Sequence, residues 1–355
     1  MPASHAIEPD PALRDLVPAP GEAVALAPGL AWHRVPLDGS PDHVNLWLVA
    51  DGEGTCAIDA GPTRPDTEAA WAALARGPLR DAPLARVLVT HLHADHLGYA
   101  HALCARPGVP LWMSAGDWAQ ARRALADDGP ASREAAVELM RRNGLDDPER
   151  LDAMRARPAA ARRLMPAVPD AFVAVRDGDA LRIGARTWRA IGGRGHAPEH
   201  LAFHCASLGV LVAGDLLLPS IAAHVGVTAD EPDGDPLGEH LESLARFDGL
   251  PEDTLVLPSH GVPFRGPDRR LAQLRAHHAR RLDALRAACG RPRSALELVP
   301  EPLRRRLSAH RLGLALTGTL AHLHRHWHAG RLRRVEGDDG VLRFERVRAG
   351  ASGDA

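Results

Sequence analysis

Residues 87–96 read Val-Leu-Val-Thr-His-Leu-His-Ala-Asp-His, so four side chains of metal-ligand type directly follow an apolar run. The apolar run predicts a buried strand, and α/β folds tend to place their sites at the carboxyl ends of such strands. Imidazole and carboxylate groups suit zinc, iron or manganese. These side chains could also be exposed polar positions of a loop, but the HxHxDH spacing of His91, His93, Asp95 and His96 is a specific signal. We therefore predict a metal site in this segment.

Further ligands are expected later in the chain, because one short loop cannot complete two coordination spheres. Three candidates stand just after predicted strands. His196 lies in Gly-His-Ala-Pro-Glu-His, Asp215 ends an apolar run, and His260 lies in Ser-His-Gly. We expect all three to join the loop residues around two metal ions.

Short apolar runs predict two groups of strands. The first group comprises residues 43–50, 55–59 and 86–90, and the second comprises 180–191, 201–205, 208–213 and 254–257. Helices are expected at 67–76 and after Asp235-Pro236, outside these strands. Two strand groups with helices outside favour two sheets packed face to face, an αββα sandwich of the α/β class.

Two helical regions accompany the predicted sandwich. Residues 114–169 predict helices at 115–126, 132–142 and 148–157, which we interpret as an inserted helical cap over the metals. After residue 266 come a long Leu/Arg/Ala helix at 267–289, shorter helices and a hairpin at 332–347. We therefore predict a metal-binding domain at 1–266 and a small, mainly helical, winged-helix-like domain at 267–355.

The order of four motifs carries a resemblance to a known family. HxHxDH at 91–96, GHxPxH at 195–200, AGD at 213–215 and SHG at 259–261 together resemble the metallo-β-lactamase superfamily over about residues 30–265. The resemblance implies that His91, His93 and His196 hold one metal ion and that Asp95, His96 and His260 hold the other. It also implies that Asp215 bridges the two ions and that Asp59 supports the ligand loop from behind.

The residue at position 215 and the tail indicate which branches of the superfamily the chain resembles. True β-lactamases have cysteine where this chain has Asp215, so penicillin hydrolysis is not expected. An aspartate at this position resembles the dinuclear hydrolase branches of the superfamily, which include glyoxalase II-like thioesterases, lactonases and phosphodiesterases. The tail resembles that of metallo-β-lactamase-like hydrolases with a C-terminal winged-helix domain.

The resemblance implies a hydrolase with two divalent metal ions, for which zinc is favoured over iron or manganese. A hydroxide that bridges the ions would attack the substrate, Asp95 would orient this hydroxide, and His260 would help to fix the second ion. An ester, thioester or lactone is the favoured substrate, because a net charge of −2 and a helical cap suit a small acyl compound. Two alternatives stay open. One is a phosphodiesterase or ribonuclease with the same site, and the other is a regulator whose winged helix binds DNA while the metal fold senses a ligand.

Other histidines and the single tyrosine have separate interpretations. His200 can line the substrate pocket or donate to an oxyanion, but it can equally be a polar residue at the start of a strand. Tyr99 could also line the pocket or donate to an oxyanion, but packing at a helix start is the favoured role. Four histidines alternate in the tail, at 322, 324, 326 and 328, without an acidic partner nearby, and are interpreted as a solvated helix face.

Bulk composition gives the remaining expectations. The 43 Lys and Arg residues balance 45 Asp and Glu residues, so no overall charge favours nucleic acid or an anionic membrane. A small-molecule substrate is expected, a homodimer is possible, and nucleic-acid binding by the tail is possible but not favoured. The four cysteines form no CxxC pair, and the sequence has neither a long apolar run nor a secretory signal pattern. A cytoplasmic protein without a membrane segment is therefore predicted.

Overall fold

The computed structural model describes residues 6–126, 129–156 and 162–347 of the 355-residue chain. The chain divides into two compact units. The first unit comprises residues 1–127, 159–223 and 242–273, and the second comprises residues 128–158, 224–241 and 274–355. Among the described helices, none combines the length and the apolar character that a membrane span needs.

The first unit contains two sheets. In the seven-stranded sheet the strands follow their order in the chain: β1 (Ala23–Ala27), β2 (Leu30–Pro36), β3 (His43–Asp51), β4 (Gly54–Ile58), β5 (Leu84–Leu88), β6 (Leu111–Met113) and β7 (Phe172–Ala174). The six-stranded sheet has the order β13-β12-β11-β10-β9-β8: β8 (Ala180–Ile183), β9 (Arg186–Gly193), β10 (His200–Cys205), β11 (Val210–Gly214), β12 (Leu255–Pro258) and β13 (Phe264–Arg265). Pairing is parallel from β4 to β7 and between β11 and β12.

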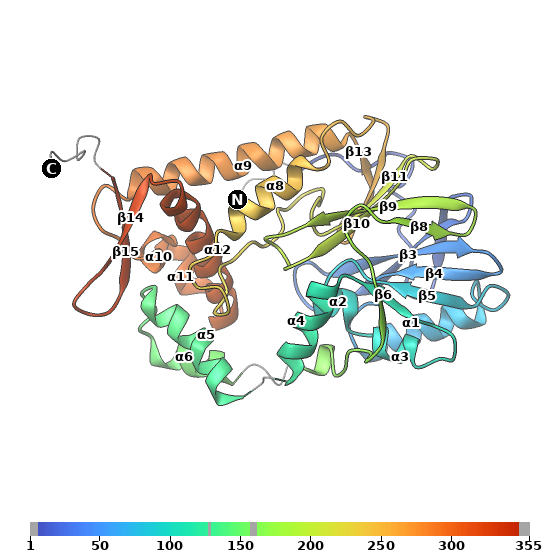
Figure 1. The fold of residues 1–355 in the computed structure, drawn as a ribbon, viewed down its shortest axis with the longest axis horizontal. Helices are drawn as coiled ribbons and strands as arrows, with labels where there is room; N and C mark the ends of the chain where they lie inside the picture. The colour runs from blue at the N-terminus through green and yellow to red at the C-terminus, as the bar shows by residue number, and fades with distance from the viewer. Residues whose placement is uncertain (1–5, 127–128, 157–161, 348–355) are drawn as a thin grey trace. The chain divides into compact units, whose positions relative to one another are not determined.

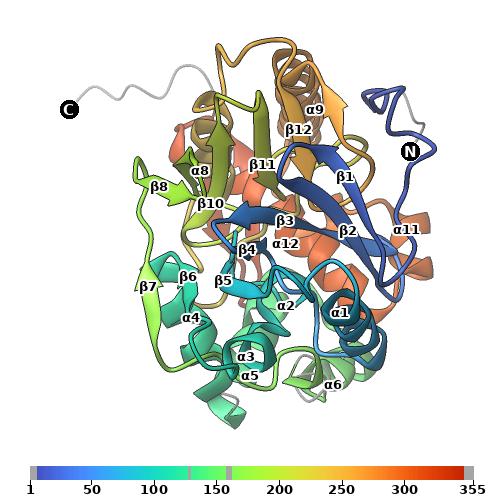
Figure 2. The ribbon, with the colours of Figure 1, turned by 90° about the vertical axis from the view of Figure 1, so that its right-hand side faces the viewer.

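The two sheets of the first unit face each other across an apolar layer (Figure 1). Trp32 and Trp47 of the first sheet meet Trp188 and Phe203 of the second in this layer, and all four are buried. A second apolar cluster joins the outer side of the first sheet to α1 (Pro65–Arg76) and α3 (Ala100–Cys104), which lie on that side in Figure 2. The expected αββα sandwich is therefore confirmed.

The second unit is mainly helical. Its elements are α5 (Pro130–Arg142), α6 (Pro148–Arg155), α10 (Ala295–Leu298), α11 (Glu301–Arg306), α12 (Ala309–His328), β14 (Leu332–Glu336) and β15 (Leu342–Arg346). Helices α8 (Pro236–Ala245) and α9 (Pro267–Ala288) contribute residues to both units. The expected tail hairpin is present as β14 and β15, which pair antiparallel, whereas its identification as the wing of a winged helix stays a prediction.

The compact units differ from the expected domains 1–266 and 267–355. Helix α4 (Ala115–Ala126) belongs to the first unit, whereas α5 and α6 belong to the second. The physical reason is that Val137 and Leu151 pack with Leu312 and Leu316 of α12 in one apolar core. The expected cap at 114–169 is therefore not one body, and its position over the metals stays a prediction. Arg157, where its last helix was expected to end, lies outside the described residues.

The histidine-rich helix of the tail corrects another expectation. His322, His324 and His326 are buried, with 3%, 1% and 2% of their surface exposed, and only His328 of the four is exposed. Helix α12 lies in the middle of the second unit, so the predicted solvated face is wrong. Each buried ring donates one N–H to a backbone carbonyl, His322 to Gly318, His324 to Gly234 and His326 to Leu282. These bonds offset the cost of burying the imidazoles.

Candidate metal centre

The first ligand loop leaves the end of β5 and enters α2 (Ala94–Leu97), as the motif predicts. His93 is the N-cap residue of α2, so Asp95 and His96 fall in the first turn of this short helix. His91 and His96 are both fully buried. The loop therefore presents its four ligand-type side chains from one strand end and one helix start.

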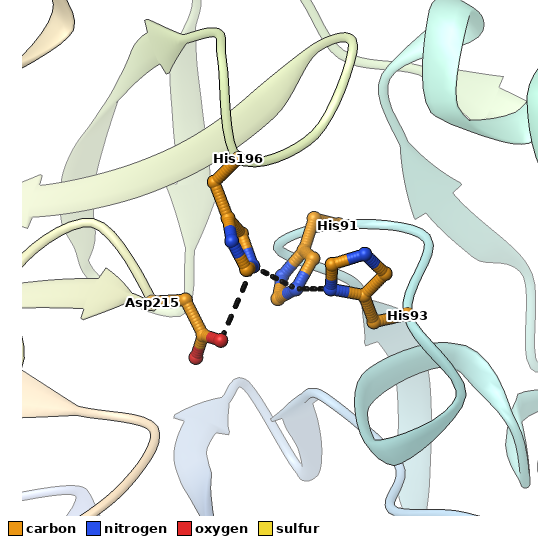
Figure 3. A group of neighbouring side chains, drawn as sticks. All are labelled: His91, His93, His196 and Asp215. Atoms are coloured by element: carbon orange, nitrogen blue, oxygen red, sulfur yellow. Dashed lines mark hydrogen bonds and ion pairs between the residues drawn. The ribbon is translucent and has the colours of Figure 1, made fainter. Parts of the chain in front are cut away.

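Four side chains from three segments gather at a first candidate metal site, the first group: His91, His93, His196 and Asp215. Their ligand atoms all lie within 4.8 Å of one another. The Nε2 atom of His91 is 3.0 Å from Nδ1 of His93 and 3.2 Å from Nε2 of His196. Oδ2 of Asp215 lies 3.2 Å from Nε2 of His196 (Figure 3). These residues can hold one metal ion.

A second group is formed by Asp95, His96 and His260, again with ligand atoms within 4.8 Å. Oδ2 of Asp95 is 3.5 Å from Nε2 of His96 and 3.5 Å from Nε2 of His260. Oδ1 of Asp215 lies 3.5 Å from His96 Nε2 and 3.4 Å from His260 Nε2. The two carboxylate oxygens of Asp215 thus face different groups.

The donor set fits a divalent cation. Two buried atoms, His96 Nε2 and Asp215 Oδ1, have no hydrogen-bond partner among the described residues, which is costly unless another ligand satisfies them. Burial alone would lower the pKa of His96, but the carboxylates of Asp95, Asp59 and Asp215 raise it well above its usual value. A cation is therefore favoured at this position, and nitrogen and oxygen donors suit zinc, iron or manganese.

The histidines of the first group are in a form that can bind metal. Burial, reinforced by neighbouring imidazoles, lowers the pKa of His91 well below its usual value and that of His93 to about 3. Both rings are thus neutral near pH 7, and a neutral imidazole has a lone pair for a metal ion.

Asp59 supports the second group from behind, in the position that the resemblance implies. Its Oδ1 accepts the Thr90 N–H at 2.8 Å, and its Oδ2 lies 2.8 Å from His96 Nδ1. Asp59 adopts φ 66°, a left-handed conformation that is uncommon for residues other than glycine and that aspartate tolerates better than most. Because Nδ1 of His96 faces this carboxylate, its Nε2 is left to face Asp95 and Asp215.

His260 is oriented by its own backbone partner. Nδ1 of His260 donates to the His43 carbonyl at 2.6 Å, which fixes the tautomer with Nε2 as the free acceptor. The side chain of Asn45 holds the same loop, because its Nδ2 donates to the carbonyls of Pro258 and Gly261, both at 2.8 Å. Asn45 is not among the residues predicted from the sequence, although a polar residue inside an apolar strand is a signal of a buried polar contact.

The two tentative residues lie in different surroundings. His200 is fully buried as the first residue of β10, and its Nε2 accepts the Asp215 N–H at 3.2 Å. This placement matches the strand-start alternative and lets His200 position Asp215. Tyr99 is the N-cap residue of α3 and packs against the apolar cluster on the outer side of the first sheet.

Comparisons with known proteins agree with this geometry. A family model described as metallo-beta-lactamase superfamily matches residues 39–260, and one described as metallo-beta-lactamase-like, C-terminal domain matches residues 282–347. The crystal structure of a beta-lactamase domain protein from Burkholderia ambifaria is 44% identical, covers 94% of this chain and 97% of its own, and has a TM-score of 0.87. The crystal structure of the metallo-beta-lactamase family protein TTHA1429 from Thermus thermophilus is 28% identical, covers 91% of this chain and 100% of its own, and has a TM-score of 0.76. The probable metallo-hydrolase YqjP of Bacillus subtilis is 26% identical over 65% of this chain and 71% of its own length.

Proposed function

Because the chain belongs to the metallo-beta-lactamase superfamily, we propose that it is a hydrolase that works with two divalent metal ions, zinc being favoured over iron or manganese. His91, His93 and His196 would hold one ion, and Asp95, His96 and His260 the other. The observation that carries the proposal is the position of Asp215, whose Oδ2 lies 3.2 Å from His196 and whose Oδ1 lies 3.4 Å from His260. One carboxylate can therefore serve both ions.

Divalent ions in these positions would lower the pKa of a coordinated water toward neutrality and offset the negative charge that develops on the substrate. The protein would supply orientation. Asp95 keeps 28% of its side chain exposed, so its carboxylate can accept a hydrogen bond from the attacking water. Asp59 holds the ring of His96, and the His43 carbonyl holds that of His260. These contacts limit the motion of the ligands during turnover.

We propose an ester, thioester or lactone as the substrate. A net charge of −2 over the whole chain offers no general attraction to a polyanion, which favours a small acyl compound. A phosphodiesterase with the same seven residues is the alternative within the same chemistry.

A panel of substrates tests this proposal. The full-length protein should be loaded in turn with zinc, iron(II) and manganese(II) and given esters, thioesters, lactones and phosphodiesters. We expect turnover of at least one acyl class, with loss of activity on chelation and recovery on metal addition. Turnover of phosphodiesters alone would contradict the acyl assignment. Activity that persists after complete chelation would contradict the metal-dependent mechanism.

For the second unit we propose a supporting role and keep the winged-helix interpretation as a hypothesis. Its described histidines form no group of three metal ligands comparable to those of the first unit. Retention of the full chain on an oligonucleotide column, measured at several salt concentrations, tests the nucleic-acid alternative. Weak retention that does not depend on salt is expected, whereas tight, strongly salt-dependent retention would favour a nucleic-acid substrate or the DNA-binding regulator.

A further inference from the structure

A buried carboxylate on α4 contacts both loops that supply histidines to the first group. Asp117, in the first turn of α4, has none of its surface exposed. Its Oδ2 accepts the Leu92 N–H at 2.8 Å, and its Oδ1 accepts the Glu199 N–H at 2.7 Å. One carboxylate thus joins two backbone segments that are more than a hundred residues apart in the chain.

These two backbone groups lie beside the proposed ligands. Leu92 stands between His91 and His93, and Glu199 stands three residues after His196. Because a carboxylate is rigid, its two hydrogen bonds limit how far the two loops can move apart. The distance between His91 and His196, 3.2 Å between their Nε2 atoms, depends on this separation.

A reciprocal contact completes the connection. The side chain of Glu199 returns to α4, where its Oε2 accepts the Gly116 N–H at 2.6 Å. A β-carbon at position 116 would lie only 2.8 Å from this oxygen, so glycine is needed for the close approach. Asp117 and Glu199 therefore each use a side-chain carboxylate to bind the backbone of the other's segment.

Burial of the Asp117 carboxylate costs stability unless hydrogen bonds replace its lost hydration. Desolvation raises the pKa of the Asp117 carboxyl to about 6, and the N–H groups of Glu199 and Leu92 oppose this rise. Burial of a polar group without such partners would cost stability, so the two hydrogen bonds offset the cost.

We propose that Asp117 is a positioning residue that sets the spacing of the first group by joining the His91–His93 loop to the His196 loop. The inference rests on the proposed function in that these loops are taken to bind metal. The second group has supports of its own, Asp59 behind His96 and the His43 carbonyl behind His260. Loss of Asp117 should therefore affect the first ion more than the second.

The test measures zinc affinity in the full-length chain by competition with a chromophoric chelator, in two parent variants. His260→Ala impairs the second group and leaves the first, whereas His196→Ala impairs the first and leaves the second. Asp117→Asn, added to each parent, keeps one acceptor oxygen but turns an amide N–H toward the other backbone N–H. We expect zinc affinity to fall about 10-fold or more in the His260→Ala parent, and less than about 3-fold in the His196→Ala parent.

Two further variants separate positioning from general destabilisation. Gly116→Ala displaces Glu199 without changing an acceptor and should give the same selective loss. Asp51→Asn is the matched control, because Asp51 is a mostly buried carboxylate that accepts the Gly184 N–H at 2.8 Å and pairs with Arg86. Asp51 is the last residue of β3, at the opposite end of this strand from His43, so this variant should lower the melting temperature and leave zinc affinity unchanged.

Equal losses in both parents, an unchanged affinity in the His260→Ala parent, or the same loss in Asp51→Asn would overturn the proposal. If Asp117→Asn does not fold, the Gly116→Ala result decides. The proposed function can fail separately, since a chain that binds two zinc ions but hydrolyses nothing still gives a valid answer here. Failure of both parents to bind zinc would overturn both.

Discussion

Replacement of Asn45 by alanine should weaken both the fold and metal binding by the proposed second group, Asp95, His96 and His260. The Asn45 side chain is fully buried. Its Nδ2 donates to Pro258 and Gly261 on the His260 loop, and its Oδ1 accepts from Trp32 Nε1 at 2.9 Å and Arg34 Nε at 3.1 Å. The side chain thus joins the first sheet to the last residue of β12 in the second sheet and to the segment that follows it.

The size of the effect follows from the groups that lose a partner. Gly261 keeps the hydrogen bond from Arg34 at 2.9 Å, so the main losses fall on Trp32 Nε1 and the Pro258 carbonyl. A buried group left without a partner costs about 2 kcal/mol, so Asn45→Ala should lower the free energy of unfolding by about 4 kcal/mol. For a unit of this size, such a loss lowers the melting temperature by about 10 °C.

The assay combines thermal unfolding of the metal-free protein with zinc titration of the folded variant. Asn45→Asp keeps an acceptor for Trp32 Nε1 but cannot donate to the carbonyls of Pro258 and Gly261. It should therefore lower zinc affinity while preserving the hydrogen bond from Trp32, which Asn45→Ala removes. Thr55→Val is a control within the same sheet, because it removes a single hydrogen bond to Ala82. A melting temperature within about 2 °C of the wild type for Asn45→Ala would refute the reasoning.

Three other outcomes are expected. Burial lowers the pKa of His278 and His324 to about 4 and that of His322 to about 3, so below pH ~6.5 the unfolded state binds more protons. The free energy of unfolding by urea should therefore be largest above pH ~6.5 and should fall between pH ~6 and ~5 by up to about 4 kcal/mol, since each of the three histidines contributes about 1.4 kcal/mol per pH unit; a flat profile from pH 7 to 5 would contradict this. In Asp59→Asn, asparagine can adopt the left-handed backbone, but its neutral amide replaces the carboxylate that faces His96 Nδ1. We expect zinc affinity, measured by titration, to fall by about 10- to 100-fold. An unchanged affinity would exclude a supporting role for Asp59. His322→Ala should reduce stability in the same urea assay but leave turnover by the folded fraction unchanged, and abolished turnover would place the tail in the chemistry.

The seven proposed ligands could be predicted because each signal is local. A histidine or aspartate directly after an apolar strand is visible within a few residues, and parallel strands bring their carboxyl ends together at one edge. The HxHxDH loop and Asp215 illustrate this. Asp117 and Asn45 could not be found this way, since Asn45 reaches a carbonyl 213 residues away and Asp117 an N–H group 82 residues away. Only the packing of the two sheets and α4 brings such groups into contact.

The tail shows a different limit. Helix α12 begins at Ala309 and continues through Gly313, although glycine is an unfavourable residue inside a helix. In the structure, a β-carbon at Gly313 would lie 3.3 Å from the Met154 side chain, so the small residue permits close helix packing. The same packing buries the alternating histidines, which no periodic pattern along one helix could indicate.

The partners of the helices at 114–169 also could not be predicted from their position between the two strand groups. Residues 114–169 were expected to form one cap, yet α5 and α6 complete the core of the second unit. The apolar residues of these helices are sparse, with only Val137, Leu139 and Leu151 buried on them, so their partner could not be identified from their own pattern. A narrow apolar stripe indicates that a helix packs against another element, but it does not identify that element.

Metal content measured by inductively coupled plasma mass spectrometry, after reconstitution and removal of loosely bound ions, tests the central claim most directly. The wild-type chain should contain about two divalent ions, since seven donor side chains exceed the needs of one tetrahedral site. Asp215→Ala should retain about one ion or fewer and lose most hydrolytic activity. A wild-type content that never exceeds one ion per chain, or an Asp215→Ala protein that keeps both ions and full activity, would contradict the shared two-metal site.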